Sequence, residues 1–135
     1  MRMPRAVLRV FAASAAGALV FAVAASPVHA IKPFYAELRA KYVKPDSKEP
    51  ADVTLLIAVE QAGCAICHPG DDTRKFTRYG GQLALRISKF DKGDKQKIRE
   101  AMDEVGALRS DPYDAKSPTF SELFRQGKLP PPPAR

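Results

Sequence analysis

Apolar side chains recur at helical spacing just after an apolar N-terminal run. Over residues 31–43, Phe34, Leu38 and Tyr42 follow one another at intervals of four, which places them on one face of a helix. Residues 44–51 hold two prolines among mostly charged neighbours, a composition typical of a loop. The pattern therefore predicts a short amphipathic helix over 31–43 that ends in a loop.

The next apolar run covers residues 52–63. Periodicity alone does not separate helix from strand in so short a segment. Asp52 can cap a helix at its start and Gly63 can end one, so helix is favoured.

A longer helix is expected over residues 73–89. Its start has three candidate capping residues, Asp71, Asp72 and Thr73. Its apolar stripe, at steps of three and four residues, consists of Phe76, Tyr79, Leu83, Ile87 and Phe90. Two adjacent glycines, Gly80 and Gly81, interrupt it at a cost of about 1 kcal/mol each relative to alanine. Such a pair indicates close approach of the helix backbone to a flat, bulky group or to a crossing helix.

Two more helices are expected in the last third of the chain. Asp94 can cap a helix over 95–108. Ser117 can cap a last short helix that has Pro118 at its first position and ends before Gly127. The buried face of the first of these contains Ile98, Met102 and Val105.

The pattern as a whole predicts an all-α fold. Four or five short helices would form one domain over residues 31–130, followed by a proline-rich tail at 131–135. About 100 residues suffice for one small domain and not for two.

The first thirty residues have the features of a secretory signal peptide. Arg2, Arg5 and Arg9 precede an apolar run of 16 residues, and Val28-His29-Ala30 fits a small-x-Ala cleavage site. A retained membrane anchor is the alternative, although a span needs about 20 apolar residues. Cleavage after residue 30 predicts a periplasmic or secreted protein with no membrane span.

The candidate chemistry lies in one short motif, Cys64-Ala65-Ile66-Cys67-His68. It reads C-x-x-C-H, the pattern of covalent c-type haem attachment. Two thiols at this spacing can form thioethers with the two vinyl groups of one haem, and the adjacent imidazole can then ligate the iron. Cys64 and Cys67 are the only cysteines, and His68 is the only histidine after residue 30.

Three other functions of these residues have weaker support from the sequence. A disulfide between the two cysteines is compatible with an oxidising compartment. A thiol-disulfide exchange enzyme would place its C-x-x-C in a βαβ context, and no convincing strand pattern is present. A zinc site would lack a fourth ligand, because the motif supplies three.

With this motif between helical segments, the chain resembles the small single-haem cytochrome c family of class I type. The motif lies in the first half of residues 31–130, whereas cytochromes c′ carry it near the C-terminus. The resemblance implies one covalent haem c, thioethers at Cys64 and Cys67, and proximal iron ligation by His68.

The distal side departs from that family, whose second axial ligand is usually a methionine in a loop well after the motif. Met102, the only methionine after residue 30, is the candidate distal iron ligand, although a methionine in an apolar helical stripe is more typical of core packing. The alternatives are an open site, water or hydroxide, or a tyrosine or lysine, with Tyr79 close in sequence. The nearby cations Arg74, Lys75 and Arg78 could neutralise haem propionates.

The charge balance is mildly basic. The whole chain carries +7, and without Arg2, Arg5 and Arg9 it keeps 19 basic against 15 acidic residues, a net charge of +4. Such a surface could steer an acidic redox partner, or it could be an ordinary solvated surface. No run of aromatic and basic residues indicates nucleic-acid binding.

These features predict an electron-transfer protein outside the cytoplasm. No enzyme is expected, since no acid–base pair or Ser-His arrangement is visible beyond the motif. The main alternative is a haem-based sensor or small-ligand binding protein with an open distal site, and a third is a haem-free protein that uses its cysteine pair.

Overall fold

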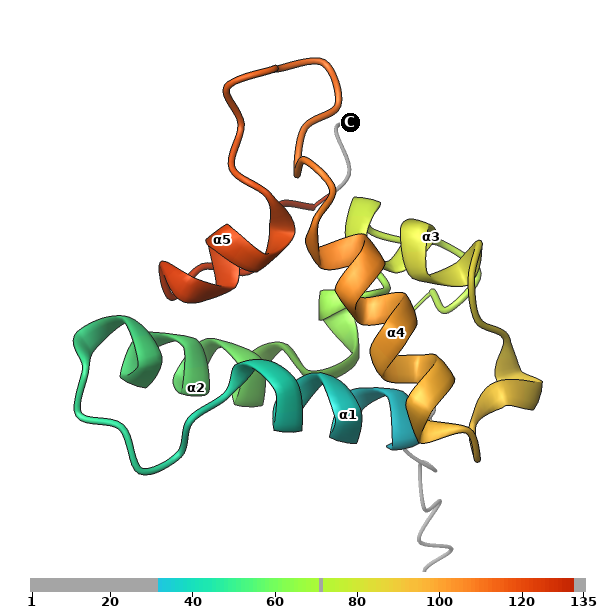
Figure 1. Ribbon diagram of the computed structural model, residues 1–135, viewed down its shortest axis with the longest axis horizontal. Coiled ribbons are helices and arrows are strands. Elements are labelled where there is room, and N and C mark those ends of the chain that lie inside the picture. The colour runs from blue at the N-terminus through green and yellow to red at the C-terminus, as the bar shows by residue number, and fades with distance from the viewer. Residues whose placement is uncertain (1–31, 71, 133–135) are drawn as a thin grey trace, which may run out of the picture.

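The computed structural model describes residues 32–70 and 72–132, and it is all-α there, as the pattern predicted (Figure 1). The described part contains no strand, only one isolated bridge between Arg109 and Thr119. The predicted signal segment and residues 133–135 of the tail lie outside the described residues. The helical elements are α1 (Lys32–Tyr42), α2 (Pro50–Ala62), η1 (Gly63–Ile66), α3 (Arg78–Ala84), η2 (Lys89–Asp91), α4 (Lys95–Gly106) and α5 (Phe120–Arg125). Within residues 32–70 and 72–132, every helix is too short or too polar to cross a bilayer.

The centre of the molecule is the crossing of α4 over α1 (Figure 1). Leu38 of α1 and the predicted apolar face of α4 are buried there to 2 % exposure or less, and that face consists of Ile98, Met102 and Val105. Each such side chain stabilises the fold by about 1.5–3 kcal/mol relative to an exposed position. An ion pair of 2.6 Å between Arg99 and the buried Glu37 also joins the two helices.

Helix α2 begins earlier than predicted and ends as predicted. Pro50 occupies its first position, where a missing N–H is tolerated, so Asp52 is inside the helix and does not cap it. The Asp52 carboxylate instead accepts a 2.6 Å hydrogen bond from the Ser47 hydroxyl. Gly63 ends the helix with a φ of 49°, a conformation that favours glycine.

The helix predicted over 73–89 is wrong in its bounds. Helix α3 spans only Arg78–Ala84, and Thr77 caps it through a hydrogen bond accepted from the backbone N–H of Gly80. The Asp72 carboxylate accepts a hydrogen bond from the backbone N–H of Arg74 within a loop, and it caps no helix. Phe90, expected on the buried stripe, is 85 % exposed in η2.

The last helix also begins later than predicted. Thr119 and Glu122 form a capping box at its start, so Ser117 and Pro118 precede α5. The Ser117 hydroxyl is used in the preceding loop, where it donates to the carbonyl oxygen of Asp111. The cap predicted for α4 is confirmed, since the Asp94 side chain accepts from the Lys97 N–H.

Candidate functional site

The C-x-x-C-H motif folds as one tight turn at the end of α2. After Gly63 the chain enters the 3₁₀ helix η1, and the backbone N–H groups of Cys67 and His68 both donate to the carbonyl oxygen of Cys64, at 3.1 and 3.0 Å. This turn brings both thiols and the imidazole to the wall of one cavity.

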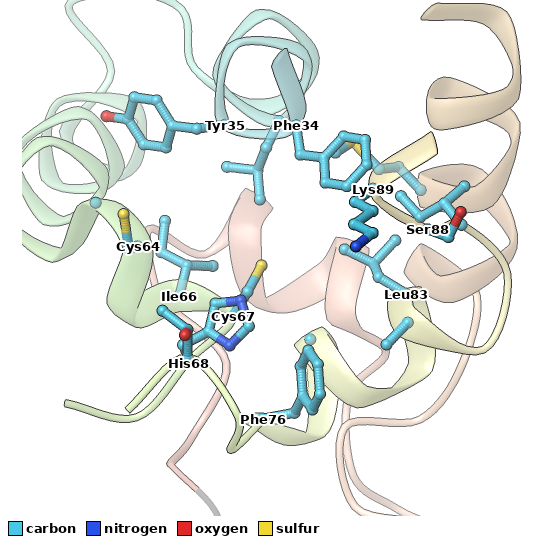
Figure 2. Close-up of a pocket in the computed structure, with 17 residues that line it drawn as sticks. Phe34, Tyr35, Cys64, Ile66, Cys67, His68, Phe76, Leu83, Ser88 and Lys89 are labelled. Atoms are coloured by element: carbon cyan, nitrogen blue, oxygen red, sulfur yellow. The ribbon is translucent and has the colours of Figure 1, made fainter. Parts of the chain in front are cut away.

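The cavity has a volume of about 580 Å³ and lies between the motif, α1, α3, η2 and α4 (Figure 2). Ligand pockets in proteins are commonly about 300–1,000 Å³. Most of the side chains that line it are apolar. Its main lining residues are Phe34, Tyr35, Leu38, Cys64, Ile66, Cys67, His68, Phe76, Leu83, Ile87, Lys89 and Met102.

The orientation of the His68 ring is set by a backbone carbonyl. Nδ1 lies 2.8 Å from the Lys75 oxygen, and because a carbonyl oxygen only accepts, Nδ1 carries the proton and donates. The ring also packs against Phe76, with ring centres 4.8 Å apart. This arrangement selects the tautomer whose Nε2 has a free lone pair, and such a hydrogen bond behind a ligating histidine is common in metal sites.

The two cysteines differ in environment. Both are free thiols, Cys64 exposed and Cys67 partly covered. Burial raises the pKa of the Cys67 thiol to about 12, with a smaller contribution from Cys64. Cys67 is therefore a protonated, weakly nucleophilic thiol at neutral pH.

Thr77 joins the motif turn to α3. Its backbone N–H donates to the Cys67 oxygen at 2.9 Å, and its hydroxyl donates to the Ile66 oxygen at 2.7 Å while accepting from Gly80. Gly80 packs directly on the backbone of Cys67. The close approach predicted from the glycine pair is thus made by Gly80 to the motif turn and not to another helix.

Met102 reaches the same cavity from α4. It is 1 % exposed and belongs to the core, and its backbone oxygen accepts a 3.2 Å hydrogen bond from the Tyr42 hydroxyl. The structure therefore brings together all four residues singled out from the sequence, Cys64, Cys67, His68 and Met102.

The other residues considered from the sequence lie elsewhere. Tyr79 is fully buried, and its hydroxyl has no hydrogen-bond partner within the described part of the chain. Arg74 is paired with Asp72, and Arg78 with Asp111.

Sequence reasoning missed two parts of the cavity wall. One is α1, whose stripe of Phe34 and Leu38 was visible as a pattern but not assigned to the site. The other is Lys89, which comes from the segment that was predicted to be the end of a regular helix.

The residues of this cavity could hold a covalently attached haem. Two thiols, an oriented imidazole and an apolar enclosure are the groups that such a cofactor needs. Across residues 32–70 and 72–132, no three His, Cys, Asp or Glu side chains gather as a site for a bare metal ion. Haem iron differs in its needs, because the porphyrin supplies most of its ligands and the protein only the axial ones.

Comparisons of the chain with protein-family models, with curated proteins and with solved structures gave no match. The case for a haem site consequently rests on the motif and on the geometry of the cavity.

Proposed function

We propose that this protein is an electron carrier outside the cytoplasm that holds one haem c through Cys64 and Cys67, with His68 as the proximal iron ligand. The observation that carries the proposal is the cavity of about 580 Å³ into which the motif turn presents all three side chains. A bound haem would supply an iron that alternates between the ferrous and ferric states.

The chain contributes position and environment. The hydrogen bond from Nδ1 of His68 to Lys75 fixes the ring and raises the donor strength of Nε2. The apolar walls from α1 and α3 limit water, which together with the axial ligands tunes a reduction potential. Met102 is the candidate distal ligand, because it lines the same cavity.

The surroundings of the motif count against a thiol-disulfide exchange function. Enzymes of that kind place their C-x-x-C in a βαβ context. Here the motif follows helix α2, and residues 32–70 and 72–132 contain helices and one isolated bridge but no strand.

A haem-based sensor is the second candidate. The observation that favours it is the position of Met102 in the middle of α4, where the side chain also fills the core. If Met102 serves packing alone, a bound haem iron would keep an open distal site.

Spectroscopy of protein made together with a haem-attachment system tests the proposal. We expect covalent haem that resists acid-acetone extraction, and reduced α and β bands of c type. His68→Ala should allow attachment but give an altered, poorly ligated spectrum. Extractable haem, or a His68→Ala spectrum equal to that of the wild type, would contradict the proposal.

A further inference from the structure

Lys89 is the one cation among the side chains that line the cavity in the described part of the chain. It begins the 3₁₀ helix η2, and its side chain reaches into the cavity on the side away from Cys64 (Figure 2). No ion pair with a carboxylate is formed by Lys89 within the described residues. Its Nζ lies 5.2 Å from the centre of the Phe90 ring.

The neighbouring carboxylate is engaged elsewhere. Asp91 accepts a 2.7 Å hydrogen bond from the Lys97 amine and a 2.8 Å bond from the Ser88 N–H. Lys89 is exposed to solvent at the edge of the largely apolar cavity, and its ammonium has three donors and no acceptor. An anionic group on a ligand in the cavity could therefore pair with it.

In a covalently attached haem, the propionates are the anionic groups, and the positions of the thioethers determine where they lie. The two vinyl groups are on adjacent pyrroles, and the two propionates are on the other two. Thioethers at Cys64 and Cys67 would hold one edge of the porphyrin at the motif turn, so the propionate edge would face the opposite wall. In Figure 2 the opposite wall is the one formed by Leu83, Ser88 and Lys89.

We propose that Lys89 pairs with a haem propionate and thereby fixes the propionate edge against η2. The inference rests on the proposed haem function and deepens it by assigning the orientation of the cofactor. Of the cations considered from the sequence, Arg74 and Arg78 are paired with carboxylates, and Lys75 is exposed and does not line the cavity.

The reduction potential of the haem-loaded protein provides the test. A positive charge beside the haem disfavours the ferric state, so Lys89→Gln should lower the potential, and Lys89→Arg should restore most of it. Lys92→Gln is the matched control, since it removes the same charge from the other end of the same turn, and Lys92 does not line this cavity. Its charge would act on the haem through more solvent, so the control should lower the potential clearly less.

A second readout separates pairing from other roles. The propionate bending mode in resonance Raman spectra should shift in Lys89→Gln and stay in place in Lys92→Gln, while the axial-ligand bands stay unchanged in both. Equal reduction potentials in Lys89→Gln and Lys92→Gln would contradict the pairing of Lys89 with a propionate and leave the proposed haem function standing. Conversion of Lys89→Gln to a high-spin spectrum would make Lys89 an iron ligand and also overturn the pairing. Wild-type protein without covalent haem would overturn the proposed function together with it.

Discussion

Gly80 lies against the carbonyl group of Cys67, so that a Cβ atom on Gly80 would come within 2.7 Å of the Cys67 carbonyl carbon and closer still to its oxygen. Helix α3 therefore packs on the motif turn through bare backbone. The thiol of Cys67 and the ring of His68 take their positions from this turn, so the glycine helps to shape the cavity.

Substitution of Gly80 should destabilise the protein where the same change next to it does not. In Gly80→Ala the methyl group would push α3 from the turn, and overpacking of this kind costs about 1–3 kcal/mol. Gly81→Ala is the control, since its Cβ would be 3.7 Å from Phe76 in ordinary contact, and alanine adds up to about 1 kcal/mol of helix stability. Denaturant titration of both variants gives the free energies of unfolding that test this prediction. An equal free energy for the two variants would contradict the close packing.

The hydroxyl group of Thr77 should contribute more to the stability of the fold than its methyl group. Thr77→Val leaves the buried Ile66 carbonyl and the Gly80 N–H without that partner, which costs about 1–3 kcal/mol. Thr77→Ser keeps both hydrogen bonds and should lose less. Thermal unfolding measures the effect, and a valine variant as stable as the serine variant would refute it.

The role of Met102 can be tested with a substitution that leaves no cavity in the core. Met102→Leu keeps the volume and should cost under about 1.5 kcal/mol, whereas Met102→Ala should cost about 2–5 kcal/mol. If the thioether is the distal ligand, the leucine variant loses the weak far-red band of a His/Met haem and gains carbon monoxide binding. An unchanged spectrum in Met102→Leu would favour the sensor with an open distal site.

Alkylation of the haem-free protein should separate the two thiols. Only thiolates react, and a pKa raised to about 12 keeps Cys67 protonated at pH values near 8. Cys64 should thus be modified first, and Cys67 should react at a comparable rate only in denaturant. Mass spectrometry of peptides after iodoacetamide treatment reports both rates. Equal rates in the folded protein would show that burial does not protect Cys67.

Much of the molecule follows from local patterns. The apolar spacing of α1 and α4 predicted both helices nearly to their ends, because each buries one face against the other. Gly63 and Asp94 acted as predicted, since a positive φ and an N-cap depend on the residue itself and its nearest neighbours. The four candidate site residues were also found without the structure.

The local sequence pattern could not decide which of several possible capping residues begins a helix. Thr73, Thr77 and Asp72 can all cap a helix, and Thr77 does so because its backbone and hydroxyl also bond to the motif turn. That tertiary contact sets the start of α3 at Arg78. The helix ends at Ala84, and Lys89 lies in the separate turn η2, which Ser88 caps. The amino-acid sequence by itself determined the motif and the helical faces, whereas the packing of α3 on the motif turn determined the far wall of the cavity, because that packing depends on contacts between segments distant in the chain.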